Sequence, residues 1–113
     1  MTTRECSSIQ EHRIASKLGG ISNSSSGSGH FNKSDVVVGT ADLVVECKTC
    51  MSPKSSFSIK KDWIEKLKQE TFSMGRSNSV IAFNFYYEDG KDYYVIDDKL
   101  MRFLVDKLKE ENS

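Results

Sequence analysis

The stretch Asp35-Val-Val-Val-Gly-Thr-Ala-Asp-Leu-Val-Val-Glu-Cys-Lys-Thr49 decides the fold of this chain. Two valine-rich runs flank a short Gly-Thr-Ala segment, an arrangement that is typical of a β-hairpin. We therefore predict one strand over Val36–Val38, a turn at Gly39–Ala41 and a second strand over Asp42–Thr49.

The second strand of this hairpin carries an unusual mixture of side chains. Successive residues of a strand point to opposite faces of the sheet. One face is apolar throughout and must be packed, since it carries Leu43, Val45 and Cys47. The other face carries Glu46 and Lys48, and two ionisable groups on one face are odd for a small sheet protein.

The residues before the hairpin predict a helix and then a loop. Residues 4–18 contain a narrow apolar stripe, and Gly19-Gly20 ends the helix as a C-terminal cap would. Serine and glycine dominate residues 22–30, a composition typical of a flexible loop. The apolar stripe of the helix consists of Ile9, Ile14, Ala15 and Leu18.

The residues after the hairpin predict a helix, a second hairpin and a last helix. Ser58 is the candidate N-cap of the first of these helices, and Gly75 ends it. A strand over Ser79–Phe85, a turn at Glu88–Gly90 and a strand over Tyr93–Ile96 follow. The apolar face of the middle helix comprises Ile59, Trp63, Ile64 and Leu67. The last helix is capped by Asp97 or Asp98, and its apolar stripe comprises Leu100, Met101, Leu104, Val105 and Leu108.

This order of elements predicts the fold class. A helix, a hairpin, a helix, a hairpin and a helix, without an internal repeat, favour an α/β or α+β fold with a central mixed sheet flanked by helices. The chain has 113 residues, a length typical of one domain, so we expect residues 1–113 to form a single domain.

Composition constrains the cellular setting. The longest apolar runs are four residues, far short of the roughly 20 that a membrane-spanning helix needs, so we expect no membrane partner. The first residues lack the apolar core of a secretory signal. Three cysteines are an odd number, which disfavours a disulfide framework and favours a reducing cytoplasm.

Charge is distributed unevenly along the chain, although the formal net charge is zero. Residues 1–85 hold 11 Lys or Arg against 8 Asp or Glu, whereas residues 86–113 hold 5 against 8. A polyanion can therefore approach the first part and avoid the last part. Taken alone, this uneven charge is explained equally simply by ordinary charged side chains on a solvated surface.

The hairpin brings a catalytic combination of residues together. Asp35 begins one strand and Glu46 lies late in its neighbour, so both carboxylates come to the same end of the hairpin. Carboxylate oxygens suit Mg²⁺, which keeps several waters and accepts phosphate oxygens. Lys48 emerges on the same face as Glu46. Such a set can activate a water and stabilise the charge that develops at a phosphodiester.

These residues resemble the signature of the PD-(D/E)XK nuclease superfamily. Ser34-Asp35-Val-Val-Val and Leu43-Val-Val-Glu-Cys-Lys-Thr49 carry the likeness, with Ser34 in place of the motif's proline. The pattern is most similar to small phage and archaeal Holliday-junction-resolvase-like members. The likeness runs from residue 5 to about residue 96, and it implies a restriction-endonuclease-like core. It also includes Glu11–Gly20, Ser26–Gly29 and Ser56–Ile64.

The resemblance implies a catalytic role for each matching residue. Asp35 and Glu46 would bind Mg²⁺, or alternatively Mn²⁺, through their carboxylates. Cys47 would offer its backbone carbonyl to the metal and turn its side chain to the core. Lys48 would orient the attacking water, and Glu11 would be a helix-borne acid at the same metal.

Other residues would bind DNA, and one assignment stays open. Glu5 lies in the same predicted helix as Glu11 and is its rival as the helix-borne acid. Ser28 and Lys33 would contact phosphate. Three further lysines would attract the DNA backbone without reading its sequence, namely Lys60, Lys61 and Lys66.

Two classes of function follow from these features. The first is a metal-dependent endonuclease for branched or double-stranded DNA, most simply a homodimeric junction resolvase in phage recombination or replication, with flap and nicking nucleases as alternatives. The second is an inactive DNA-binding module of the same fold. Cys47-Lys-Thr-Cys50 could instead form half a zinc site or a redox pair. Zinc is disfavoured because the other candidate ligands are scattered over Cys6, His12 and His30.

Overall fold

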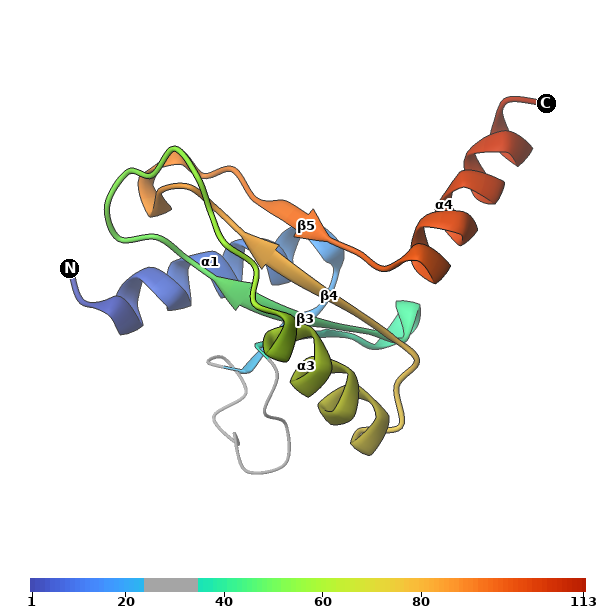
Figure 1. Cartoon of the computed structure of the whole chain (residues 1–113), viewed down its shortest axis with the longest axis horizontal. Helices are drawn as coiled ribbons and strands as arrows, with labels where there is room; N and C mark the ends of the chain where they lie inside the picture. Colours follow the sequence, from blue (N-terminus) through green and yellow to red (C-terminus); the bar gives the residue numbers. More distant parts are fainter. Residues whose placement is uncertain (24–34) are drawn as a thin grey trace.

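A five-stranded mixed sheet forms the centre of the computed structural model, which describes residues 1–23 and 35–113 (Figure 1). The strands lie in chain order, and all neighbours are antiparallel except β3 and β4, which are parallel. The strands are β1 (Ile21–Ser22), β2 (Val36–Val38), β3 (Leu43–Lys48), β4 (Asn78–Phe83) and β5 (Tyr93–Val95).

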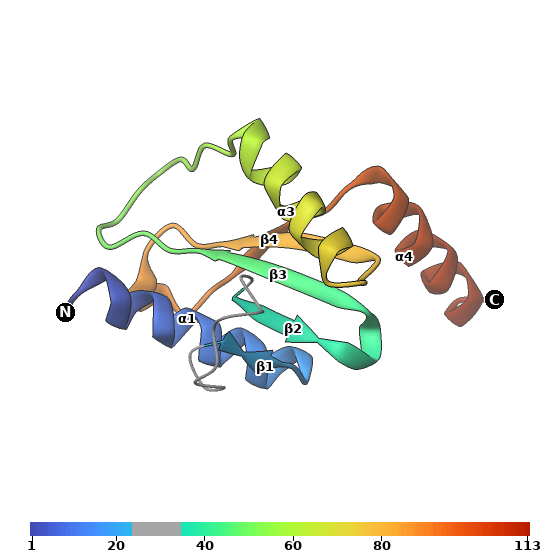
Figure 2. The ribbon, with the colours of Figure 1, turned by 90° about the horizontal axis from the view of Figure 1, so that it is seen from below.

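In residues 1–23 and 35–113, three helices flank this sheet, which confirms the predicted mixed α/β class with a sheet flanked by helices. Helix α1 and helix α3 cover opposite faces, as Figure 2 shows. The helices are α1 (Thr3–Leu18), α3 (Lys61–Ser73) and α4 (Asp98–Glu111), and short 3₁₀ turns cover η1 (Gly39–Ala41) and η2 (Tyr87–Asp89). In the part of the chain that the structure describes, no helix is long and apolar enough to cross a membrane.

The first hairpin follows the prediction closely. β2 and β3 are joined by η1, and their register pairs Val36 with Val45. Val45 and Cys47 pack in the cluster of apolar side chains on the α1 side of the sheet, whereas Val44 packs on the α3 side. The alternation along β3 therefore leaves Glu46 and Lys48 on the α3 side, as expected.

Helix α1 has the predicted ends but a different buried face. Thr2 and Glu5 form a capping box, and Gly19 ends the helix with a left-handed φ of 72°. The predicted stripe is wrong at Ile9 and Leu18, which are 42% and 38% exposed. The buried face of α1 instead comprises Cys6, Gln10, Glu11, Ile14 and Ala15. Polar residues can occupy it because they find buried partners, as described below.

Gly20 lets the chain turn tightly from α1 onto the sheet. A Cβ atom at this position would lie 2.7 Å from the Val37 carbonyl oxygen, so no larger residue fits there. Ser22, predicted as the start of a loop, belongs to β1. The remainder of that prediction from residue 24 onward lies outside the described residues.

Helix α3 begins later than the sequence suggested. Its N-cap is Lys60, and the prediction of Ser58 as N-cap is wrong. Ser58 lies two residues before the cap, and α3 starts without a side-chain cap, with Asp62 in its first turn instead. An acidic residue there stabilises the positive end of the helix dipole. The predicted apolar face is confirmed, since Trp63 and Leu67 belong to the cluster on this side of the sheet.

The last helix begins at the predicted cap but packs differently from the other helices. Asp97 caps α4 by accepting a hydrogen bond from the Leu100 N–H at 2.9 Å. Leu100 packs against the sheet cluster, yet α4 has no buried residue. Phe103 and Leu108 are 55% and 60% exposed, and Figure 1 shows α4 leading away from the sheet.

Candidate active site

The end of the first hairpin brings two carboxyl groups into contact. Asp35 immediately precedes β2, and the register that pairs Val36 with Val45 places it beside Glu46. Its Oδ2 atom accepts a hydrogen bond from the Cys47 N–H at 2.8 Å. The Asp35 carboxyl also lies close enough to the Glu46 carboxyl to raise its pKa. The backbone of β3 therefore fixes the Asp35 carboxyl beside Glu46.

Burial and the neighbouring Asp35 carboxyl make Glu46 a weaker acid than an ordinary glutamate. Burial, the hydrogen bond with Asp35 and the Asp35 charge raise the pKa of Glu46 from 4.5 to about 8, in that order of size. The Lys48 charge acts in the opposite direction. Two adjacent carboxyl groups do not ionise together easily, because like charges repel in a partly buried site. Glu46 therefore keeps its proton at neutral pH, and the two neighbouring carboxyl groups offer a site for a cation.

Lys48 completes this group from the last position of β3. Its ammonium nitrogen lies 4.3 Å from the centroid of the Trp63 ring, and the nitrogen of Lys60 lies 5.7 Å from it. A cation over an indole face is attracted by the ring quadrupole. The Trp63 ring thus holds the Lys48 ammonium on the side of the sheet that carries Glu46.

Glu11 lies on the other side of β3. It is a buried residue of α1, and its charge acts on the thiol of Cys47. Burial and the charges of Asp35 and Glu11 raise the pKa of that thiol well above its usual range, and Cys47 packs against the α1-side cluster as predicted. Glu5 is exposed and belongs to the capping box. Of the two rivals, Glu11 is therefore the one next to β3.

Two carboxylates are present for a metal, and the full predicted set is not assembled. Asp35 and Glu46 can offer oxygens to Mg²⁺, with water completing its shell. Over residues 1–23 and 35–113, no group of three or more His, Cys, Asp or Glu side chains is arranged to hold a metal ion. The roles of Glu11 and of the Cys47 carbonyl at a metal stay predictions. Cys6, Cys47 and Cys50 are free thiols.

The lysines predicted to bind DNA lie around the start of α3. Lys60, Lys61 and Lys66 are exposed. Lys61 and Lys66 approach acidic neighbours one helical turn away at 3.8 Å and 3.5 Å. Such exposed pairs contribute little energy, so they leave both cations available for a stronger anion. Ser28 and Lys33 lie outside the described residues.

Glu70 is a neighbour of this site that sequence reasoning missed. Its charge adds to the forces that raise the pKa of Glu46. Its Oε2 atom is buried without a hydrogen-bond partner among the described residues. The signal was its spacing: Glu70 follows Leu67 by three positions and Trp63 by seven, so it lies on the same face of α3.

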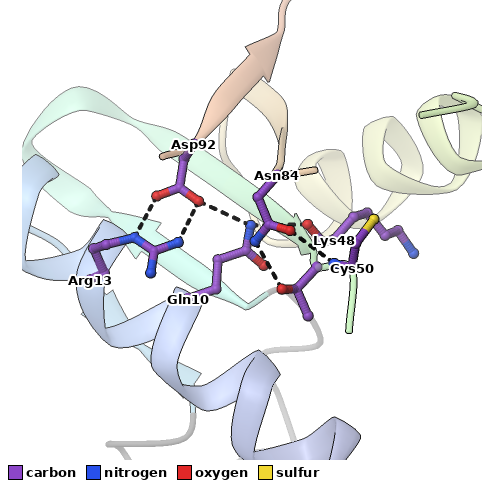
Figure 3. A network of polar contacts seen from close by, with 7 residues as sticks. Gln10, Arg13, Lys48, Cys50, Asn84 and Asp92 are labelled. Atoms are coloured by element: carbon purple, nitrogen blue, oxygen red, sulfur yellow. Dashed lines mark hydrogen bonds and ion pairs between the residues drawn. The ribbon is translucent and has the colours of Figure 1, made fainter. Parts of the chain in front are cut away.

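A buried polar network also escaped the sequence, and it surrounds the end of β3 (Figure 3). Arg13 donates two hydrogen bonds to Asp92, at 2.8 Å from Nε and 2.7 Å from Nη2. Gln10 Nε2 donates to the Lys48 carbonyl at 3.0 Å and to Asp92 at 3.3 Å. Asn84 accepts a hydrogen bond from the Cys50 N–H at 2.8 Å. The residues come from α1, from the end of β4 and from the start of β5. They are far apart in the sequence, so no local motif predicts the network.

Comparison with known proteins leaves the family open. The chain matches no protein-family model, no curated protein and no solved structure.

Proposed function

We propose that this protein is a metal-dependent endonuclease that hydrolyses DNA phosphodiester bonds. The observation that carries the proposal is the contact between Asp35 and Glu46, with the Lys48 ammonium on the same face of β3. A divalent cation can take the place of the Glu46 proton, because the cation removes the repulsion between the two ionised carboxylates.

Each residue of the group has a chemical task in this proposal. Mg²⁺, when bound, would supply a polarised water and neutralise charge at the phosphate. Asp35 and Glu46 are the residues that would hold the cation once Glu46 is ionised. Asp35 is fixed by the Cys47 N–H, so its carboxylate needs no rearrangement. Lys48 leaves the Trp63 ring to orient the water or to pair with a phosphate oxygen.

DNA is the substrate that the surrounding charge favours. Lys60, Lys61 and Lys66 lie at the N-terminal half of α3, on the helix that covers this face of the sheet. Lysines of this kind bind the phosphate backbone without reading bases. Recognition would then depend on DNA shape, and a branched molecule such as a four-way junction is the substrate class we propose.

A second copy of the chain is the partner we propose, because α4 leaves an apolar face open. Phe103 and Leu104 border a groove of about 730 Å³ that continues to Leu43 and Val80 on the sheet. An isolated helix of this length is marginal in water, so packing must stabilise it. The chain has no net charge, so two copies do not repel. A twofold pairing of α4 would also supply two active sites for symmetric incision.

The test is cleavage of a labelled panel of DNA molecules with Mg²⁺ or with EDTA. The panel contains a four-way junction, a flap, a duplex and a single strand. We expect cleavage of the junction with Mg²⁺ and none with EDTA. Cleavage of the flap alone would retain the nuclease and reject the resolvase. Salt-sensitive binding without cleavage under any metal would favour an inactive DNA-binding module.

A further inference from the structure

The end of β3 is held by side chains that the proposed chemistry does not use. Lys48 is the last residue of the strand, and the chain then crosses residues 49–60 without a helix or strand. Backbone groups that leave a sheet need other partners when they are buried. The Lys48 carbonyl finds its partner in Gln10, which is 1% exposed and comes from α1.

The Gln10 amide is itself fixed by an ion pair. Its Nε2 atom also donates to Asp92 Oδ1 at 3.3 Å. Arg13 binds both carboxylate oxygens of Asp92 in a bidentate arrangement. The Asp92 side chain is 3% exposed. Figure 3 shows the three side chains connected by hydrogen bonds, from Arg13 through Asp92 and Gln10 to Lys48.

The residues just after Lys48 are clamped in the same way. Asn84 is fully buried after the end of β4. It accepts from the Cys50 N–H and donates to the Thr49 hydroxyl, both at 2.8 Å. The backbone on the carboxyl side of Lys48 is thus fixed by side chains from α1 and from β4.

A buried ion pair of this kind is weak evidence for stability. Removing two charged groups from water costs about as much as their attraction returns, and apolar residues of similar size often replace such a pair without loss. The consequence of the Arg13–Asp92 pair is geometric. The pair fixes one position of Gln10 and therefore one position of the Lys48 backbone. The lysine side chain then starts from a fixed point between Glu46 and Trp63.

We infer that Gln10, oriented by the Arg13–Asp92 pair, is a positioning residue for Lys48. The inference rests on the proposed function, in which the Lys48 ammonium acts at the phosphate. Gln10 touches neither DNA nor metal in this scheme. It acts through the Lys48 carbonyl and determines where the ammonium lies.

Trp63 is the only tryptophan of the chain, so its fluorescence reports the ammonium position without any cleavage assay. The test variant is Gln10→Met, which removes the amide donor, keeps the side-chain length and leaves the Arg13–Asp92 pair intact. Lys48→Met gives the emission of Trp63 without the Lys48 ammonium, with the Lys60 ammonium still near the ring. Gln69→Met, the same change at an exposed position of α3, is the matched control.

We expect Gln10→Met to shift the Trp63 emission toward that of Lys48→Met and to lower kcat by up to ~100-fold, with KM for DNA within twofold of wild type, because a displacement of about 1 Å at a catalytic group can have this effect. Arg13→Lys, which keeps the charge but loses the fork, should shift both readouts less. Wild-type emission in a folded Gln10→Met protein overturns the inference, even where cleavage falls. If wild type cuts no DNA, the proposed function fails, and the emission shift still decides the position of Lys48.

Discussion

Replacing Glu46 by Gln should stabilise the protein in alkaline solution and abolish its cleavage of DNA. The folded state raises the pKa of Glu46 from 4.5 to about 8, so it binds a proton more tightly than the unfolded chain does. The contribution of Glu46 to the free energy of unfolding is therefore fully present below pH 4.5, falls as the pH rises to 8, and then stays level. Gln cannot ionise, so the variant escapes this fall.

The magnitude follows from the same pKa change. One pKa unit corresponds to about 1.4 kcal/mol, so a fully buried carboxyl would lose about 5 kcal/mol between these pH values. Glu46 is half-buried, and solvent screens part of this loss, so we expect about 2 kcal/mol. For a domain of this size, that difference raises Tm by about 8 °C.

Thermal and urea unfolding at pH 5 and pH 9 measure this difference. We expect wild type and Glu46→Gln to match at pH 5, because a protonated Glu46 and a Gln can both donate to Asp35. Glu65→Gln, at a side chain that is 58% exposed in α3, is the control and should change little at either pH. Equal stabilities at pH 9, or an advantage of the same size at pH 5, would refute the reasoning. Added Mg²⁺ should stabilise wild type at pH 9 and leave Glu46→Gln unchanged.

Three other variants test the remaining parts of the proposal. Asp35→Asn should abolish cleavage and leave DNA affinity largely unchanged in a filter-binding assay, and cleavage at the wild-type rate would reject the site. Replacing Lys60 and Lys61 by Ala should reduce the slope of log K on log[salt] by about 2, since each phosphate contact contributes about 0.9; an unchanged slope would remove both lysines from the DNA interface. Phe103→Glu should convert a dimer to a monomer in light scattering, whereas Phe72→Glu, at a phenylalanine of α3 that is even more exposed, should not. A monomeric wild type would contradict the proposed pairing.

The sequence predicted those parts of the fold whose causes are local. The valine runs and the Gly39–Ala41 turn fixed the first hairpin, and period-two alternation placed Glu46 and Lys48 on one face. Gly19 ended α1 for a similarly local reason, its left-handed backbone. The misplaced N-cap of α3 at Ser58 is a local failure, whereas the failure on the buried face of α1 is non-local. Gln10 is buried because Asp92, 82 positions away, accepts its hydrogen bond, and no pattern in the sequence relates the two.

The open face of α4 is a failure of another kind. Its amphipathic pattern predicts a buried stripe, and the structure leaves Phe103 and Leu108 exposed. Periodicity indicates that a face must be covered, but it does not identify what covers it. The same limit applied to Glu70, whose position on the packed face of α3 was visible in its spacing but whose charge suggested solvent.

The Arg13–Asp92 pair has a consequence for the order of folding. It joins residues 79 positions apart, so its loop-closure entropy must be overcome before the contact returns any energy. The two hairpins close over much shorter distances and can form first. The pair should therefore be absent from the transition state, and Arg13→Met should speed unfolding while leaving the folding rate in a chevron plot nearly unchanged. The Arg13–Asp92 pair would then form late in folding. It would slow unfolding without changing the rate at which the folded state is reached.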